Sequence, residues 1–199
     1  TEYGTLYSLQ ELEELSAVCR ERDLKLFVDG ARLAYALASP ANDVTLADLA
    51  RLTDVFYIGG TKCGALFGEA VVIPTRGSIR QFVTQMKQHG ALLAKGRLLG
   101  VQFEALFEDG LYLTIGEPAV KATARIREAL KRAGYVVTMD SPTNLTFVAL
   151  DQAGHERLSD KVRYSIWETL PDGRYLARIG TSWATPEEDV VAFEQALAR

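Results

Sequence analysis

The chain has 199 residues, of which 48% are hydrophobic, and a formal net charge of −4 at neutral pH. This length can bury a sizeable core in one domain or two small ones, and the acidic balance offers no basic surface for nucleic acid. Two cysteines fit a reducing compartment without disulfides, and no apolar stretch is long enough for a membrane span or a signal peptide, so we expect a cytoplasmic protein.

The first fifty residues predict three helices and a strand. Ser8 is followed by Glu11 in a capping-box pattern, and the apolar residues after it recur at helical spacing. A short apolar run over 24–28 predicts a strand that ends at Asp29. The predicted helices span residues 8–22, 32–38 and 46–52.

A second charged residue follows the next predicted strand. The apolar run over 54–58 leads through two glycines and a threonine to Lys62, and a further strand is predicted over 70–73. Continuous apolar runs are typical of parallel strands that are covered on both faces, and ligands of such sheets collect at the carboxyl ends of the strands. We therefore expect Asp29 and Lys62 to meet at one edge, either as a site or as an ion pair that fills space.

The pair of Asp29 and Lys62 fits pyridoxal phosphate. This cofactor needs a lysine amine for a Schiff base and a carboxylate that keeps its pyridine nitrogen protonated. Gly30 and Ala31 beside the aspartate, and three glycines around the lysine, are small enough to leave room for a flat ring. Thr61 offers a hydroxyl to the phosphate. The aspartate and the lysine alone are weak evidence, and these small neighbours strengthen it.

Residues 78–113 predict two helices with a glycine-marked break near 89–96. The break and its border carry several basic side chains, among them Lys95 and Arg97. These residues either bind an anion or belong to a solvated loop, and the local pattern leaves both interpretations open.

A glycine and a proline near residues 115–118 predict a boundary between two domains, 1–115 and 116–199. The second is predicted as a small α+β domain, with helices over 119–133, 154–161 and 186–197 and strands over 135–138, 145–150, 162–169 and 174–181. Arg178 alternates with apolar residues in the last strand, and its planar guanidinium suits the carboxylate of an amino acid. The alternative is a surface arginine on an edge strand.

The histidines, Cys63 and the two tryptophans are interpreted as structural residues without a catalytic or metal-binding role. Neither histidine has the spacing of a metal ligand, so we predict no metal site. Cys63 is interpreted as a small apolar residue beneath the lysine loop. Trp167 and Trp183 are interpreted as core or interface aromatics.

The segments around the aspartate and the lysine resemble a known family. DGARLAYA followed by DVFYIGGTKCGALFGEAVVI is similar to the aspartate and lysine segments of the fold-type I pyridoxal-phosphate enzymes, and most closely to the threonine aldolase and β-eliminating lyase family. The stretches GTLYSLQELEELSAVCRERDLKLFVDGAR and RIGTSWATPEEDVVAF match its pattern as well, so the resemblance covers nearly the whole chain.

The resemblance implies an α/β fold in which a mostly parallel sheet domain is followed by the small C-terminal domain. It places the following residues at the cofactor: Lys62, Asp29, Ala31, Arg32, Thr61, Lys95 and Arg97. In that family the stretch around Lys95 and Arg97 lies near a subunit interface and can send a cation to the phosphate of a neighbour, which implies a homodimer or homotetramer. Arg178, with Arg32, would bind the substrate carboxylate, although Arg32 can instead pair with Asp43 or Asp54.

The activity that the resemblance implies is that of a low-specificity threonine aldolase, which cleaves a β-hydroxy-α-amino acid to glycine and an aldehyde. Elimination of a β-substituent from another amino acid, or a non-catalytic module for dimerisation or interaction, remain alternatives. In the family a glycine-rich phosphate cradle and a ring that stacks on the cofactor precede the aspartate strand. Since only 28 residues precede Asp29, we expect the chain to be the C-terminal part of a longer protein.

Overall fold

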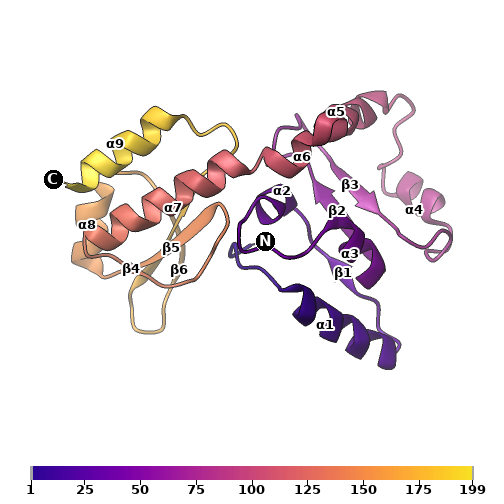
Figure 1. Ribbon diagram of the computed structural model, residues 1–199, viewed down its shortest axis with the longest axis horizontal. Coiled ribbons are helices and arrows are strands. Elements are labelled where there is room, and N and C mark those ends of the chain that lie inside the picture. The colour runs from indigo at the N-terminus through magenta and orange to yellow at the C-terminus, as the bar shows by residue number, and fades with distance from the viewer. Residues whose placement is uncertain (1, 199) are drawn as a thin grey trace.

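The computed structural model describes residues 2–198, and these form two halves that each contain a sheet and a buried core (Figure 1). The first half contains α1 (Leu9–Glu21), β1 (Phe27–Val28), α2 (Leu33–Leu37), α3 (Leu46–Leu52), β2 (Val55–Gly59), β3 (Glu69–Val72), α4 (Phe82–Gln88), α5 (Arg97–Phe107), a 3-10 helix η1 (Glu108–Gly110) and α6 (Leu111–Thr114). The second contains α7 (Glu117–Arg132), β4 (Val136–Val137), β5 (Leu145–Leu150), α8 (Gln152–Ser159), β6 (Ser165–Thr169), β7 (Tyr175–Gly180) and α9 (Glu187–Ala198). The predicted division at residue 115 agrees with this arrangement but stays a prediction.

The first sheet has the strand order β1-β2-β3 and is mixed. β1 runs parallel to β2, as predicted, with Phe27 opposite Val55. β3 instead runs antiparallel to β2, with Gly59 opposite Glu69. The loop between β2 and β3 returns the chain directly, whereas a parallel neighbour would require a longer crossover connection. The predicted mostly parallel character therefore holds only for β1 and β2 among these strands.

The helix starts follow the local sequence. The Ser8 hydroxyl accepts a hydrogen bond from the Glu11 N–H at 3.2 Å, and the Glu11 carboxylate accepts one from the Ser8 N–H at 2.8 Å, so the predicted capping box is confirmed. Thr45 and Asp48 make the same box at the start of α3. α1 and α3 are joined where the buried Ser16 hydroxyl donates to a backbone oxygen at the end of α3, at 2.7 Å.

The predicted helical region after residue 78 is more broken than expected. The break between α4 and α5 is confirmed, but the second helix does not continue to residue 113. Asp109 and Gly110 have φ angles of 51° and 73°. These values lie in the left-handed region, which an α-helix cannot use, so η1 separates α5 from α6.

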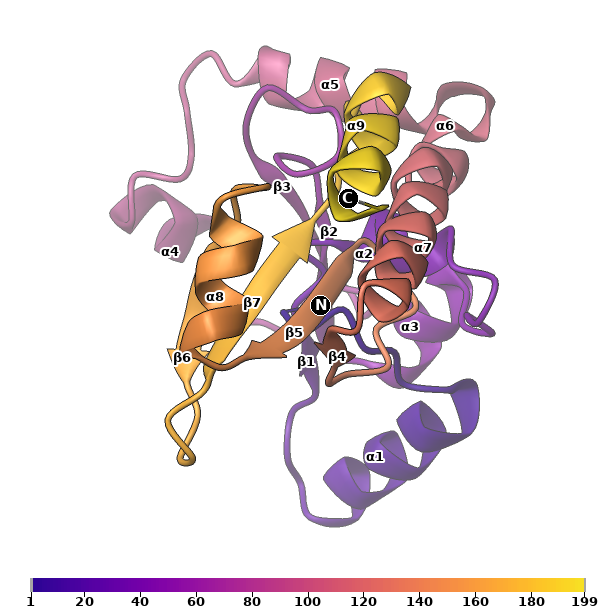
Figure 2. The ribbon, with the colours of Figure 1, turned by 90° about the vertical axis from the view of Figure 1, so that its left-hand side faces the viewer.

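The second sheet is antiparallel, with the order β4-β5-β7-β6. Figure 2 shows α7, α8 and α9 in front of this sheet, and they cover the face that carries Val148, Leu150, Ala177 and Ile179. The alternating residues Leu145, Phe147 and Leu176 form a separate cluster with Trp167 on the other face. Because side chains alternate along a strand, Arg178 shares this second face with Leu176.

Several hydrogen bonds join the halves, and two of them involve residues near the start of the chain. The Ser141 hydroxyl donates to the Tyr3 carbonyl oxygen at 2.6 Å, and the Thr143 hydroxyl donates to the Gly4 carbonyl oxygen at 2.9 Å. The beginning of the chain therefore lies against its second half. None of the helices between residues 2 and 198 is both long and apolar enough to cross a membrane.

Candidate functional site

A hollow of about 560 Å³ lies between the two halves and is lined by four of the eight predicted site residues. Its lining comes from the lysine loop, α2, β5, β6, β7 and the segment that follows β7: Arg32, Tyr35, Thr61, Lys62, Asn144, Leu145, Ser165, Arg178, Gly180, Thr181, Ser182, Trp183 and Thr185. The structure therefore brings Arg32, Thr61, Lys62 and Arg178 together, although they are far apart in the sequence.

The lysine loop is anchored from inside the protein while Lys62 itself is exposed. The hydroxyl of the buried Tyr35 donates to the Lys62 carbonyl oxygen. The Cys63 thiol is fully buried and donates to the Gly59 carbonyl oxygen at 2.8 Å. Burial raises the pKa of the Cys63 thiol to about 11, so it stays protonated at neutral pH. The interpretation of Cys63 as a packing residue is confirmed.

Asp29 stands at the end of β1, and its carboxylate accepts a hydrogen bond from the Ala31 N–H at 2.9 Å. Burial raises the pKa of Asp29, but hydrogen bonds from Tyr57 and Ala31 and the charge of Lys62 lower it by more, so the net pKa lies below its usual value. The carboxylate is therefore ionised at neutral pH. In turn, burial and the neighbouring Asp29 raise the pKa of Tyr57 to about 12.

The charge of Lys62 lowers the pKa of Asp29, but the two side chains do not line the same hollow. Asp29 lines an adjacent, largely apolar hollow of about 450 Å³, together with Phe27 and Val28 of β1. The amine belongs to the hollow between the halves. That the two groups hold opposite ends of one cofactor stays a prediction.

The glycines near the site have a different role from the one expected. A Cβ atom on Gly30 would lie 1.8 Å from the Tyr57 carbonyl oxygen, and one on Gly59 would lie 2.3 Å from the Ala31 carbonyl oxygen. The space that these two glycines leave is therefore filled by backbone, which corrects the prediction that they make room for a ring. They allow the ends of β1 and β2 to touch, and so set the spacing between the aspartate and lysine segments.

Two guanidinium groups share the hollow. Burial lowers the pKa of Arg32, and the positive charge of Arg178 lowers it further, which shows that the two cations lie close enough to repel. The Arg178 guanidinium carbon lies 4.4 Å from the centre of the Trp167 ring. Arg174, on the turn before β7, pairs with Asp172 at 2.7 Å and does not line the hollow.

The carboxylates proposed as alternative partners of Arg32 make other contacts. Asp43 accepts a hydrogen bond from the Leu9 N–H at 2.9 Å. Asp54 pairs with Lys25 at 3.3 Å. Both contacts lie within the first half, and neither Asp43 nor Asp54 lines the hollow.

The remaining predicted cofactor residues divide into two groups. The Thr61 hydroxyl lines the hollow and donates to the Gly68 carbonyl oxygen at 3.3 Å. Ala31 contributes its backbone N–H, which donates a hydrogen bond to the Asp29 carboxylate. Lys95 and Arg97 are exposed at the start of α5 and do not line the hollow, so their predicted role toward a neighbour's phosphate stays a prediction.

The hollow also contains residues that the sequence did not single out as functional. Trp183 is 45% exposed and lines the hollow, so its interpretation as a core aromatic is wrong, while its interpretation as an interface aromatic stays a prediction. Its N–H donates to the Tyr35 hydroxyl at 3.3 Å. Asn144 donates from Nδ2 to the Thr181 carbonyl oxygen at 2.7 Å, while its buried Oδ1 has no partner among residues 2–198. A signal was available for Trp183, which follows Arg178 in the RIGTSWAT segment.

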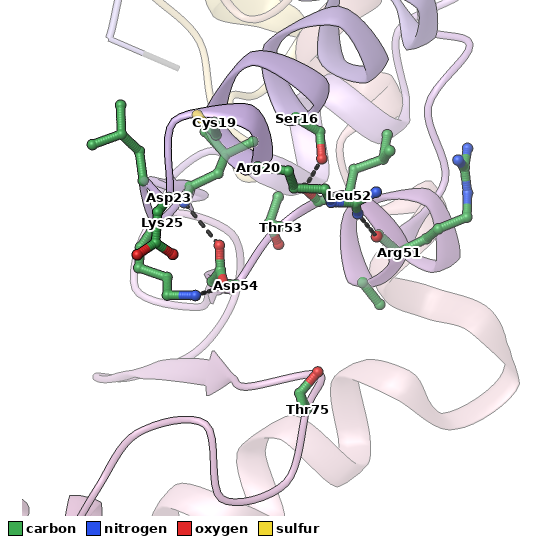
Figure 3. Close-up of a pocket in the computed structure, with 13 residues that line it drawn as sticks. Ser16, Cys19, Arg20, Asp23, Lys25, Arg51, Leu52, Thr53, Asp54 and Thr75 are labelled. Carbon is green, nitrogen blue, oxygen red and sulfur yellow. Dashed lines mark hydrogen bonds and ion pairs between the residues drawn. The ribbon is translucent and has the colours of Figure 1, made fainter.

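A third hollow, which is polar and has a volume of about 320 Å³, lies at the amino ends of β1 and β2 (Figure 3). Its polar groups are bonded to one another: Arg20 donates to the Arg51 carbonyl oxygen at 2.9 Å and Lys25 pairs with Asp54 at 3.3 Å (Figure 3). None of the predicted site residues lines it. Asp29 and Lys62 instead follow the carboxyl ends of β1 and β2.

Comparisons with known proteins show which family the chain resembles. The model of the β-eliminating lyase family matches residues 1–153. A low specificity L-threonine aldolase from Pseudomonas sp. (strain NCIMB 10558) is 38% identical over 195 residues, which cover 96% of this chain and 54% of the relative. This chain therefore spans about half the length of that relative.

Solved structures resemble the whole chain. A threonine aldolase from Leishmania major is 45% identical, with a TM-score of 0.93 over 100% of this chain and 58% of that one. An aspartate aminotransferase from Thermus thermophilus has the same fold at 17% identity, with a TM-score of 0.69 over 98% of this chain and 53% of that one. These likenesses confirm the predicted α/β fold of the fold-type I class.

Proposed function

Since the chain belongs to the β-eliminating lyase family, we propose that it acts as a pyridoxal-phosphate-dependent lyase, and specifically as a low-specificity threonine aldolase. The reaction cleaves a β-hydroxy-α-amino acid to glycine and an aldehyde. The observation that carries this proposal is the meeting of one amine and two guanidinium groups, from Lys62, Arg32 and Arg178, in a single hollow.

The residues present fit the cofactor. Lys62 presents an exposed amine on an anchored loop, Asp29 presents an ionised carboxylate at the end of the neighbouring strand, and Thr61 presents a hydroxyl beside the lysine. Lys62 would hold the aldehyde carbon of the cofactor, Asp29 its pyridine nitrogen and Thr61 its phosphate. When bound, pyridoxal phosphate supplies an electron sink for the negative charge that develops on the substrate's α-carbon.

The two arginines fit the substrate. Their mutual repulsion in a half-buried hollow is relieved when an anion lies between them, and an α-carboxylate is the anion that every amino acid carries. Arg178 would hold this carboxylate through its planar N–H fork. Arg32 would assist from the start of α2.

Lys62 Nζ is the group in the hollow that can move a proton at the substrate's α-carbon. In the aldol reaction the β-hydroxyl group loses its proton as the Cα–Cβ bond breaks, and Lys62 Nζ would deliver a proton to the α-carbon to complete glycine. In a β-elimination, which the family's name keeps as a second candidate, it would take the α-proton while a β-substituent leaves. The relative and the solved structure that are called threonine aldolases favour the first reaction.

The exposed apolar side chains of the lysine loop and α5 support a homodimer or homotetramer. Leu66 is 84% exposed, Phe67 44% and Leu98 68%. Contiguous exposed apolar surface of this kind is typical of protein interfaces. Lys95 and Arg97 border this surface in sequence, so we place them toward a neighbouring subunit's phosphate. Both cysteines are free, which supports a cytoplasmic location.

Borohydride reduction of the purified protein loaded with pyridoxal phosphate tests the proposal. The visible absorbance of the bound cofactor should disappear, and peptide mapping should find the reduced adduct on Lys62. Lys62→Ala should remove both signals. In a separate assay, the unreduced loaded protein should release glycine from threonine and allo-threonine. An adduct on another residue, or no adduct, contradicts the proposal, whereas an adduct without glycine favours the β-elimination.

A further inference from the structure

Trp167 lies at an irregularity in β6. Ser165 and Ile166 pair with Arg178 and Ala177 of β7, but Glu168 then pairs with the very next β7 residue, Leu176. Trp167 is therefore an extra residue, which is the definition of a β-bulge. Bulges re-aim side chains and are frequent beside active sites. This one places the Trp167 ring beneath Arg178, on the face opposite α7, α8 and α9.

The Trp167 ring is held from two sides. Its centre lies 5.8 Å from that of Tyr3 at an interplanar angle of 75°, and 6.2 Å from that of Phe147 at 81°. Both angles are those of edge-to-face packing, which aromatic pairs prefer. The indole N–H also donates to the Tyr3 hydroxyl at 3.4 Å. Because Phe147 is fully buried, the ring rests on a fixed support.

The Arg178 guanidinium lies over the Trp167 ring. Its carbon is 4.4 Å from the ring centre, within the range of a cation–π interaction. Among residues 2–198 no carboxylate pairs with Arg178. A carboxylate partner would neutralise the guanidinium and occupy its N–H donors, whereas the uncharged ring leaves the positive charge available to an anionic ligand.

The ring also counters an unfavourable interaction. Arg32 lines the same hollow as Arg178, and the positive charges of the two side chains repel each other. A cation–π contact holds the guanidinium without neutralising it.

We propose that Trp167 is a positioning residue that holds the Arg178 guanidinium in place for the substrate carboxylate. The inference rests on the proposed function, in which Arg178 binds that carboxylate. Trp167 itself does not line the hollow, so it acts through the arginine and not by contact with the substrate.

The test compares ligands with and without a carboxylate in the protein loaded with pyridoxal phosphate. Titration of the cofactor absorbance gives Kd for glycine and for ethylamine, which keeps an amine but lacks the carboxylate. Trp167→Leu should weaken glycine roughly 3- to 20-fold and leave ethylamine unchanged. Trp167→Phe keeps a ring and should restore most of the glycine affinity. Met139→Ala, in the same apolar cluster but outside the hollow, should change neither Kd.

Each other outcome has a definite meaning. If Trp167→Leu weakens both ligands equally, or if Met139→Ala has the same effect as Trp167→Leu, the ring only supports packing and the inference is overturned. An unchanged glycine Kd in Trp167→Leu, together with a weakened one in Arg178→Gln, overturns the inference but keeps the proposed function. An unchanged glycine Kd in Arg178→Gln overturns the proposed role of Arg178 itself.

Discussion

The hydroxyl of Tyr35 donates a hydrogen bond to the backbone carbonyl oxygen of Lys62. The same hydroxyl accepts one from the Trp183 N–H at 3.3 Å. Tyr35 is almost fully buried, and burial raises the pKa of its hydroxyl, so this group remains a neutral donor. One side chain from α2 thus fixes the lysine loop and the segment after β7, which form two walls of the hollow.

Tyr35→Phe should destabilise the protein. The change leaves the Lys62 carbonyl oxygen and the Trp183 N–H without their shared partner, at a cost of about 1–3 kcal/mol in the free energy of unfolding. Urea unfolding measures this cost. Tyr175→Phe is the matched control, because the hydroxyl of Tyr175 bonds to an exposed glutamine side chain at 3.1 Å, and the loss there should stay within about 0.5 kcal/mol. Equal losses in the two variants would contradict the role of Tyr35.

Arg178→Lys should weaken amino-acid binding while the charge is kept. Lysine lacks the planar fork that grips both carboxylate oxygens, so we expect Kd for glycine to rise by roughly tenfold to a hundredfold. Arg174→Lys makes the same change on the turn before β7, where the arginine pairs with Asp172 outside the hollow. Its glycine Kd should match that of the unaltered protein. A comparable rise in both variants would show a general effect of arginine loss.

Asp29 should make stability depend on pH in the acid range. Its folded pKa lies below the unfolded value of about 3.9. The ionised carboxylate therefore stabilises the fold above the unfolded pKa, and this contribution is lost as pH falls through the folded pKa. The difference in free energy of unfolding between the unaltered protein and Asp29→Asn should shrink toward acid pH in urea titrations.

Tyr57→Phe is the companion variant for this titration. It removes one hydrogen-bond donor from the carboxylate, so the folded pKa of Asp29 should move toward its unfolded value, and the acid loss should be smaller and complete at a higher pH than in the unaltered protein. A stability difference between the unaltered protein and Asp29→Asn that stays constant from neutral pH to about pH 3 would rule out this linkage.

Cys63 should resist alkylation in the folded protein. Its thiol is fully buried and has a pKa of about 11, so only about one molecule in a thousand carries the reactive thiolate near pH 8. Cys19 on α1 is partly exposed and serves as the internal control. Mass spectrometry after iodoacetamide should find Cys19 modified first, and both cysteines modified after unfolding. Rapid modification of Cys63 in the folded protein would contradict its burial.

The sequence was sufficient to locate a site candidate when the position of that residue follows from the apolar pattern of its own strand. Asp29 and Lys62 each follow an apolar run, and Arg178 alternates with apolar neighbours, so local patterns located all three. Tyr35 had no such signal. Its hydroxyl contacts a residue 148 positions away, and no local pattern reveals which backbone groups a buried side chain will reach.

Two other differences have the same origin. The glycines of the site loops were correctly noticed, but the atoms that fill the space beside Gly30 and Gly59 belong to distant backbone. Likewise, the apolar run that forms β3 does not reveal whether this strand runs parallel or antiparallel to β2. That direction depends on the length and path of the lysine loop.

The contact between Tyr3 and Trp167 joins residues 164 positions apart in the chain. A ribosome adds about 5–20 residues per second, so roughly 8 to 33 seconds separate the synthesis of Tyr3 from that of the indole that it supports. The support beneath Arg178 can therefore form only after β6 has been made, long after the lysine loop has left the ribosome's active centre.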